Sequence, residues 1–388
     1  MKKKTKFKAN IFANFFLFFF FFFTTDFTTT IIYQSTKIIH QSKEDYEDYG
    51  IKHNKFHHHL KENISTGGVF NDQKYIVKTN SLGFRDKEVR NINYKNVGKR
   101  LVLIGDSFTF GTLLNYEDTF AGMIDDELSQ IGKKKKGGGD EWEVLNLGVP
   151  SYSPIIYYNK VKYFLEKGLK FTHLAVFIDI SDIEDEAIYY YYDENLQSVQ
   201  STQSTQSTQF VNKFKVYLKN NFFVTYNFLN YFHDKIFYDH YNTYKNPEEF
   251  LKKIHSNSYK RDKWTINHNI YAEYQTGVDN SLKYMKLLKL LCDKHNIKMY
   301  AAVYPWSTQL YFKDLESIQV KIWEKFSQEN KIEFINLFPL FLSKNDTNED
   351  INKKIKKYYI PFDVHFNKEG NKIIADYFLK VFNNYRNF

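Results

Sequence analysis

The sequence predicts an α/β protein with a parallel β-sheet covered by helices on both faces. Three observations lead to this prediction. Short apolar runs alternate with amphipathic segments of helical length from Arg100 onward. The runs are too short for buried helices and are followed by turn residues, as in strands covered on both faces. Such alternation is typical of βαβ units, in which consecutive strands run parallel.

Five apolar runs are the predicted strands of this sheet. They span Leu101–Ile104, Glu143–Leu147, Thr172–Asp179, Lys298–Tyr304 and Ile332–Leu337. Five segments with apolar residues at helical spacing are the predicted helices. They span Asp118–Ile131, Pro154–Lys167, Asp279–His295, Leu315–Glu329 and Lys368–Asn384. The length of 388 residues suggests either two domains at most or one such domain with a large insertion.

The insertion, Ile183–Gly277, separates the third and fourth predicted strands. Its Ser-Thr-Gln repeat, Ser201–Gln209, cannot form a core, so we predict a disordered loop there. The Tyr- and Phe-rich stretch that continues to Tyr244 is too aromatic for disorder and is expected to form helices. The insertion starts at the carboxyl end of a strand. It is therefore either a lid or acceptor-binding cap over a site at that edge, or a surface addition.

Ser107 is the candidate nucleophile. The run Leu101–Gly111 passes from an apolar strand through Gly-Asp-Ser into a turn. Open α/β sheets bind their ligands at the carboxyl ends of the strands, which is where this layout puts the Ser107 hydroxyl. Asp106 is expected to organise the turn, since an Asp side chain can accept hydrogen bonds from neighbouring backbone amides.

Asp363 and His365 are the candidate partners of Ser107. They stand two positions apart just before the last predicted helix. In an extended segment such residues point to the same side, about 7 Å apart along the chain. A carboxylate there can orient an imidazole, and the imidazole can take the proton of a serine hydroxyl.

These motifs resemble the SGNH, or GDSL, hydrolase superfamily. Gly105-Asp106-Ser107 is similar to its first block, Asn146-Leu147-Gly148 to its second and Asp363-Val364-His365 to its last. The lead-in Thr79–Arg85, together with Asp118–Phe120 and Val303–Trp306, resembles an exported bacterial branch that includes polysaccharide O-acetyltransferases and esterases.

The resemblance implies a three-layer, flavodoxin-like sandwich with a five-stranded parallel sheet. It implies that Ser107 is the nucleophile, His365 the base and Asp363 the residue that holds the imidazole. The backbone amides of Ser107 and Gly148 would face the oxyanion. The resemblance implies neither a metal nor an organic cofactor.

The third block departs from the family pattern. Where the family has Gly-x-Asn-Asp, this chain has Asp179-Ile180-Ser181-Asp182. Ser181 stands at the place of the Asn that donates to the oxyanion, and a hydroxyl can donate one hydrogen bond. Either Ser181 or Asp182 completes the oxyanion hole, or they cap the segment that follows.

Four other residues stand out. Two of them have either a binding or a structural role, and the other two are expected to be structural. Arg85 either binds an anionic substrate group or ties the lead-in to the sheet, and its turn-like neighbours favour the second role. Trp306 stacks on a sugar ring or packs in the core. Asn146 is expected to organise the end of its strand. Cys292, the only cysteine, lies on the apolar face of a predicted helix and is expected to be a buried thiol.

The N-terminal head predicts export. Lysines precede the apolar segment Ile11–Phe23, which has the length of a signal peptide and lacks a marked cleavage site. Residues 1–32 are therefore a signal peptide or an uncleaved membrane anchor, with the lysines on the cytoplasmic side. Residues 33–78 are predicted to be a linker and lead-in, and residues 79–388 the hydrolase-like domain.

Composition and charge argue against nucleic-acid binding and against a zinc site. The formal net charge of +9 comes largely from the head, which holds five lysines between Lys2 and Lys8. No basic face with interleaved aromatic residues is evident, so we expect no nucleic-acid partner. His53 and His57–His59 are interpreted as a solvated cluster, because a zinc site needs a defined ligand set.

The function expected from these features is that of a serine esterase that acts on an acyl ester, with an acylated cell-envelope glycan as the substrate by resemblance. Two alternatives are a polysaccharide O-acetyltransferase and a catalytically inactive glycan-binding protein of the same fold. The sequence indicates neither the acyl group nor an oligomeric state.

Overall fold

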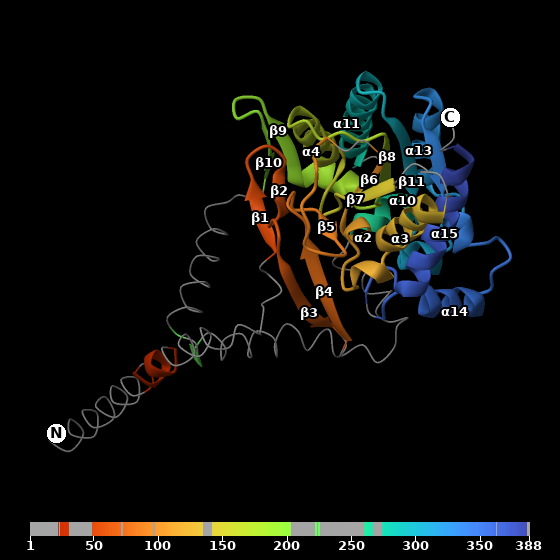
Figure 1. The fold of residues 1–388 in the computed structure, drawn as a ribbon. Helices are drawn as coiled ribbons and strands as arrows, with labels where there is room; N and C mark the ends of the chain where they lie inside the picture. The colour runs from red at the N-terminus through yellow and green to blue at the C-terminus, as the bar shows by residue number, and fades with distance from the viewer. Residues whose placement is uncertain are drawn as a thin grey trace, which may run out of the picture. The chain divides into compact units, whose positions relative to one another are not determined.

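The computed structural model describes residues 22, 24–30, 49–70, 73–95, 98–134, 142–202, 222, 224–225, 260–266, 274–361 and 363–385 (Figure 1). The chain forms two compact units. Met1–Glu44 and Gln203–Lys245 make up the first, and Asp45–Thr202 and Asn246–Phe388 the second. Within the first unit, the backbone amides of Val224 and Thr225 donate to the carboxylate of Asp26 at 2.6 and 2.9 Å.

The second unit is built on one sheet with the strand order β12-β11-β8-β6-β7-β5-β4-β3. Its five parallel strands are β6 (Lys99–Gly105), β7 (Trp142–Asn146), β8 (His173–Ile178), β11 (Lys298–Val303) and β12 (Glu333–Asn336). β6 lies between β7 and β8, which is the flavodoxin-like order. The five predicted strands are confirmed, with ends that agree to within two residues.

Three antiparallel strands extend this sheet beyond β7. They are β3 (Ser65–Phe70), β4 (Gln73–Thr79) and β5 (Arg85–Asp86). Along β4, Tyr75 and Val77 are buried while Ile76 is half exposed, which is the alternation of a sheet covered on one face. Part of the segment expected to be a linker or lead-in is therefore strand.

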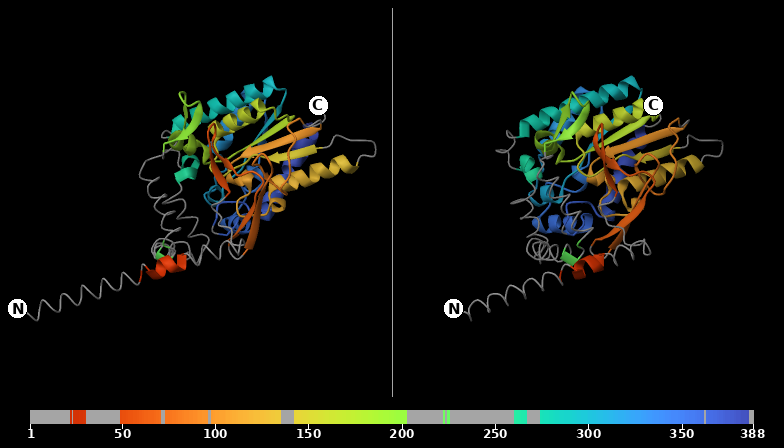
Figure 2. Two further views of the ribbon diagram at one scale, coloured as in Figure 1. Left: turned by 60° about the vertical axis from the view of Figure 1, so that its left-hand side comes forward. Right: turned by 90° about the vertical axis from the view of Figure 1, so that its left-hand side faces the viewer.

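Helices cover both faces of the sheet. α3 (Phe120–Lys134) and α15 (Lys368–Tyr385) contact each other on one face, and α4 (Pro154–Glu166) and α11 (Gln275–Lys294) on the other (Figure 2). α13 (Ile318–Glu329) packs against β11 and β12. All five predicted helices are confirmed. A further helix, α14 (Asn348–Tyr358), was not predicted; its first turn is capped by Thr347.

Short helical segments connect the main elements. They are α2 (Ser107–Phe110), η2 (Tyr116–Asp118), α5 (Asp182–Glu184), the π-helical segment η3 (Asp185–Tyr189), η6 (Lys260–Asp262), α10 (Lys263–Ile266), α12 (Ser307–Tyr311) and η8 (Phe338–Leu340).

Two antiparallel hairpins lie beside the main sheet. One pairs β1 (Gly50–His53) with β2 (His57–Leu60), and the other pairs β9 (Tyr190–Asp193) with β10 (Ser198–Ser201). The Val199 amide donates to the Lys55 carbonyl at 3.0 Å, and Phe56 and Val199 form a parallel bridge. The two hairpins are therefore joined to each other through their backbones.

The interpretation of His53 and His57–His59 as a solvated cluster is wrong for His59 and holds only in part for the other three, which are half-buried. His59 is buried, and its Nε2 atom lies 2.8 Å from the Leu82 carbonyl oxygen. His58 Nε2 lies 2.8 Å from the Pro150 carbonyl oxygen. The ring nitrogens of His58 and His59 can leave water because backbone carbonyls far along the chain give them hydrogen-bond partners. A local sequence pattern does not reveal such partners.

The core lies between the sheet and its two helical layers. Every residue of β8 is buried, as are the residues of β6 after Lys99, which explains their continuous apolar sequences. Each buried Leu, Ile or Val contributes about 1.5–3 kcal/mol relative to an exposed one. Cys292 is buried as expected, and burial raises the pKa of its thiol to about 12.

Within the described residues, no helix has the length and apolar character needed to cross a bilayer. The apolar head Ile11–Phe23 lies outside these residues except for Phe22. The Ser-Thr-Gln repeat beyond Thr202 and the aromatic stretch to Tyr244, apart from residues 222 and 224–225, also lie outside them.

Candidate active site

The turn after β6 presents the side chain of Ser107. β6 ends at Gly105, Asp106 is the N-cap residue and Ser107 begins α2. The Asp106 carboxylate accepts a hydrogen bond from the Phe108 amide at 2.9 Å, so its expected role in the turn is confirmed. A Cβ at Gly105 would meet Thr109 Oγ1 at 2.1 Å and the Phe177 carbonyl at 2.6 Å. Only glycine therefore lets α2 pack so close to the sheet.

The loop before α15 presents Asp363 and His365. Its two sides are joined by a bridge between Tyr359 and Phe366 and by a hydrogen bond from the Ile360 amide to the His365 carbonyl at 2.9 Å. The Tyr359 hydroxyl also donates to the carbonyl of Pro305, at the end of β11, at 2.8 Å. The loop is thus attached to the same sheet edge at which β6 ends.

Ser107, His365 and Asp363 form one hydrogen-bonded row. His365 Nε2 lies 2.8 Å from Ser107 Oγ, and His365 Nδ1 lies 2.5 Å from Asp363 Oδ1. The His365 amide also donates to Asp363 Oδ1 at 2.8 Å. With Nδ1 protonated toward Asp363, Nε2 is left to accept the serine proton, which is the arrangement that activates a hydroxyl.

The charges in this row shift the pKa values of both partners. Burial alone would lower the pKa of His365, but the charge and hydrogen bond of Asp363 outweigh it and raise that pKa above 6.5. Burial likewise opposes ionisation of Asp363, yet His365 holds the Asp363 pKa below its ordinary value. The pair therefore favours an imidazolium beside a carboxylate, which is the state produced when His365 takes a proton.

Asp106 gives the Ser107 hydroxyl a second acceptor. Ser107 Oγ lies 3.1 Å from Asp106 Oδ2, and the Tyr304 hydroxyl donates to Asp106 Oδ1 at 3.2 Å. Burial and the nearby charge of Asp179 raise the pKa of Asp106 to about 7. Since a hydroxyl has a single proton, the protonation of Asp106 influences whether Ser107 donates to it or to His365.

Asn146 and Gly148 lie against α2 as the sequence pattern suggests. Asn146 Nδ2 donates to the Thr109 carbonyl at 2.7 Å, and its Oδ1 accepts from the Gly148 amide at 2.9 Å. A Cβ at Gly148 would meet the Phe110 amide nitrogen at 2.7 Å. Asn146 therefore organises its strand end as expected. Glycine is required at position 148 for close packing, and its N–H already has an acceptor.

Asp179 and Ser181 lie at the carboxyl end of β8. The Ser181 amide donates to Asp179 Oδ1 at 2.8 Å, and the Trp306 indole N–H donates to Asp179 Oδ2 at 2.7 Å. Ser181 is the N-cap residue of α5, but its side chain makes no capping hydrogen bond. Asp182 is buried and accepts a hydrogen bond from Tyr157 at 2.9 Å. Neither side chain caps α5, and a role for Ser181 at the oxyanion stays a prediction.

Arg85 and Trp306 have structural roles. The Arg85 guanidinium is buried, donates to the carbonyls of Phe110, Gly111 and Leu114, and lies over the Phe110 ring. It ties the lead-in to the segment after α2, as we expected. Trp306 is only 3% exposed, so its face is not available to stack on a sugar.

Lys160, which is fully buried on α4, was not among the residues predicted to be important. Its ammonium donates to the Leu147 carbonyl at 2.9 Å and to the Tyr152 hydroxyl at 3.1 Å. It also lies 4.6 Å from the Tyr152 ring centroid. One signal was available. Lys160 stands four residues after Ile156 and four before Phe164, both buried, so it falls on the apolar stripe of the helix.

A metal site is not evident in the described part of the chain, where no group of three or more His, Cys, Asp or Glu side chains could hold an ion.

The comparisons with known proteins concern the fold. No protein-family model matches the chain, and no curated protein matches its sequence. Among solved structures, the chain is similar to an acetylxylan esterase from Geobacillus stearothermophilus, with 11% identity and a TM-score of 0.36 over 74% of this chain and 95% of that chain.

Two further solved structures are similar to the same extent. One is a member of the lipolytic protein G-D-S-L family from Veillonella parvula, with 10% identity and a TM-score of 0.36 over 74% of this chain and 98% of that chain. The other is a psychrotrophic esterase from a Pseudoalteromonas species, with 9% identity and a TM-score of 0.35 over 75% of this chain and the whole of that one.

Proposed function

We propose that this protein is a serine esterase that hydrolyses an acyl ester by double displacement. The observation that carries the proposal is the row Ser107–His365–Asp363, with distances of 2.8 and 2.5 Å between its polar atoms. A nucleophile, a base and a residue that orients the base are the three parts required to activate a serine.

In the first half of the reaction, Ser107 Oγ attacks the acyl carbonyl while His365 Nε2 takes its proton. Asp363 stabilises the imidazolium that results. The tetrahedral intermediate collapses when His365 gives the proton to the departing alcohol, which leaves the acyl group on Ser107. In the second half, a water molecule gives a proton to His365 Nε2 and attacks the acyl carbonyl. When this second tetrahedral intermediate collapses, the bond to Ser107 Oγ breaks, His365 returns the proton to Ser107 Oγ, and the acid leaves.

The proposed oxyanion donors are the amides of Ser107 and Gly148 and the hydroxyl of Ser181. Ser107 is the first residue of α2, and the first N–H groups of a helix have no partner within it. The Gly148 amide donates to Asn146 Oδ1, so it would have to share that hydrogen bond with the oxyanion. Loss of one such donor lowers kcat by about a hundredfold or more.

The proposed substrate is an acylated glycan of the cell envelope, and the proposed location is outside the cytoplasm. The order of lysines followed by the apolar segment Ile11–Phe23 supports export, by cleavage or as a membrane anchor. A sugar hydroxyl in place of water as the acyl acceptor would make the same site an O-acyltransferase.

The test is hydrolysis of an aryl acetate by the purified full-length chain and by its Ser107→Ala variant. We expect the variant to lose nearly all activity, a fall of about a thousandfold or more. Ser343→Ala, which changes an exposed loop serine, is the matched control and should keep full activity. Equal rates for the Ser107 variant and the unmodified chain would contradict any serine mechanism and favour an inactive binding protein.

A further inference from the structure

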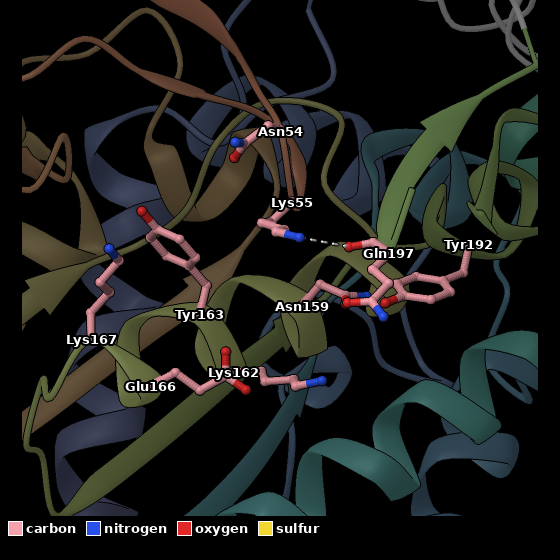
Figure 3. A pocket seen from close by; sticks show the side chains of 9 residues that line it. All are labelled: Asn54, Lys55, Asn159, Lys162, Tyr163, Glu166, Lys167, Tyr192 and Gln197. Atoms are coloured by element: carbon pink, nitrogen blue, oxygen red, sulfur yellow. Dashed lines mark hydrogen bonds between the residues drawn. The ribbon is translucent and has the colours of Figure 1, made fainter. Parts of the chain in front are cut away.

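A polar cavity of about 570 Å³ lies on α4, outside the Ser107 row. Three parts of the chain form its walls: the turn between β1 and β2, residues of α4 and its C-cap between Asn159 and Lys167, and the hairpin β9–β10 (Figure 3). Its volume is within the range of sites that hold small ligands or sugar units. None of its lining residues takes part in the chemistry described above.

The walls of this cavity are held together independently of any ligand. The Val199 amide donates to the Lys55 carbonyl, so the two hairpins are fixed to each other. On the helical side, the Tyr163 ring packs edge-on against His53 and Phe56, with centroid distances of 4.8 and 5.5 Å. The cavity is therefore a built feature of the fold.

The charge of the cavity is positive. Lys55, Lys162 and Lys167 line it together with a single acidic residue, Glu166. Among the residues that the structure describes, no carboxylate forms an ion pair with these three lysines. Lys55 lies 3.5 Å from the Gln197 carbonyl, and Lys162 and Lys167 lie over the rings of Tyr158 and Tyr163. The ammonium groups can therefore bind anionic groups of a ligand.

The uncharged lining groups suit a sugar. Tyr163 and Tyr192 offer aromatic rings that are partly exposed, which can pack against the apolar face of a pyranose. Asn54, Asn159 and Gln197 carry amides, which both donate and accept and so match vicinal hydroxyl groups. Aromatic rings, amides and lysines that form no ion pair with a described carboxylate together match a sugar ring that bears a carboxylate.

We propose that this cavity binds an anionic oligosaccharide, with uronic-acid carboxylates at Lys162 and Lys167 and a sugar ring beside Tyr192. α4 links this cavity to the segment after Gly148, because Asn159 lies five residues, about 7.5 Å of helix rise, beyond Pro154. A polymer held in the cavity would raise the local concentration of its esters near Ser107. This last step rests on the proposed esterase function, whereas binding itself does not.

Binding is tested with the full-length chain carrying Ser107→Ala, so that no ester chemistry intervenes. Isothermal titration calorimetry with oligogalacturonates is compared with neutral xylo-oligosaccharides of the same length. We expect the acidic probe to bind about tenfold or more tightly than the neutral one, and the affinity to fall with added salt.

Variants locate the binding. Lys162→Glu combined with Lys167→Glu should weaken binding of the acidic probe by about tenfold or more. The matched control is Lys325→Glu combined with Lys356→Glu, which changes the net charge equally on exposed positions of α13 and α14 and should leave binding unchanged. Tyr192→Ala should weaken binding severalfold. Thermal unfolding of each variant checks that it is folded.

Three results would overturn the proposal. They are equal affinity for the acidic and neutral probes, unchanged affinity of the Lys162/Lys167 variant, and equally tight binding of single-stranded DNA of the same charge. The last would mark a general polyanion surface instead of a sugar site.

A kinetic experiment separates this proposal from the proposed function. In the chain with Ser107 intact, the Lys162/Lys167 variant should raise KM for O-acetylated polygalacturonate and leave the rate with an aryl acetate unchanged. Absence of aryl acetate hydrolysis would count against the esterase but would leave the binding result standing. An unchanged KM for the polymer would overturn the link between the cavity and the substrate.

Discussion

His365 Nε2 lies 2.8 Å from Ser107 Oγ although 258 positions separate the two residues in the chain. The contact exists because β6 and the loop before α15 meet at one edge of the sheet, where Tyr359 anchors that loop to the end of β11. The proton path of the proposed reaction is therefore short and depends on one loop.

Asp363→Asn should lower kcat by roughly a hundredfold to ten-thousandfold, because an amide no longer stabilises the imidazolium or holds the tautomer with Nδ1 protonated. The measurement is aryl acetate hydrolysis at saturating substrate. Asp376→Asn, an exposed change on α15, is the control. A loss of less than threefold for Asp363→Asn would argue against its proposed role.

The activity should fall on the acid side with a midpoint above pH 6.5. The reaction needs a neutral imidazole as the base, and the pKa of His365 is raised by Asp363. As the pH falls through that raised pKa, His365 becomes protonated and can no longer accept the Ser107 proton. The pH profile of kcat/KM measures this pKa in the free enzyme, and an acid limb centred below pH 6 would contradict the prediction.

Asp106→Asn should shift this acid limb to lower pH. The Asp106 charge helps to raise the pKa of His365, and an amide removes that contribution. Asn is also a good N-cap residue, so α2 should keep its cap and the protein its fold. The readout is the midpoint of the acid limb beside the thermal stability. A shift to higher pH, or none, would show that the charge of Asp106 does not act on His365.

Glu186→Gln should stabilise the protein at high pH. Glu186 lies in η3, and its buried side chain reaches the start of α4, where Oε1 accepts from Ser153 Oγ at 2.8 Å and from the Ile155 amide at 2.6 Å. Burial raises its pKa to about 7, against 4.5 for an ordinary glutamate. The folded state therefore holds a proton that the unfolded state loses, so stability falls as the pH rises from 4.5 toward 7.

A glutamine keeps both hydrogen bonds and has no charge to bury. We expect its free energy of unfolding to exceed that of the unmodified protein by about 2–3 kcal/mol at pH 8 and to agree within about 1 kcal/mol at pH 5. Urea unfolding at the two pH values measures the difference. If the glutamine variant gains the same free energy of unfolding at both pH values, the ionisation of Glu186 is not the source of the gain.

The strands of the sheet and the individual members of the Ser107 row could be predicted from the sequence because each is marked by local signals. Apolar runs such as Leu101–Ile104 mark buried strands, and Gly105 and Asp106 mark the turn that presents Ser107. The short spacing of Asp363 and His365 is also local. The sequence alone does not bring Ser107 to His365, but the parallel topology places the ends of all these strands at one edge.

Other features depend on contacts that no local pattern encodes. His59 is buried by its contact with Leu82, and His58 reaches Pro150, so an apparently polar segment became part of the core. The antiparallel strand β5 has only two residues and is defined by its pairing with β4 and β7. The Asp179 carboxylate accepts a hydrogen bond from the indole of Trp306, which follows the end of another strand.

The attachment of the Asp363–His365 loop also has a consequence for biosynthesis. A nascent chain that has emerged only through β12 would carry Ser107 without His365, its proposed base. Contacts between such distant positions form slowly, since a long loop must close before they gain any free energy. Recovery of the proposed hydrolysis during refolding would therefore report one of the latest events in assembly, after the central strands have paired.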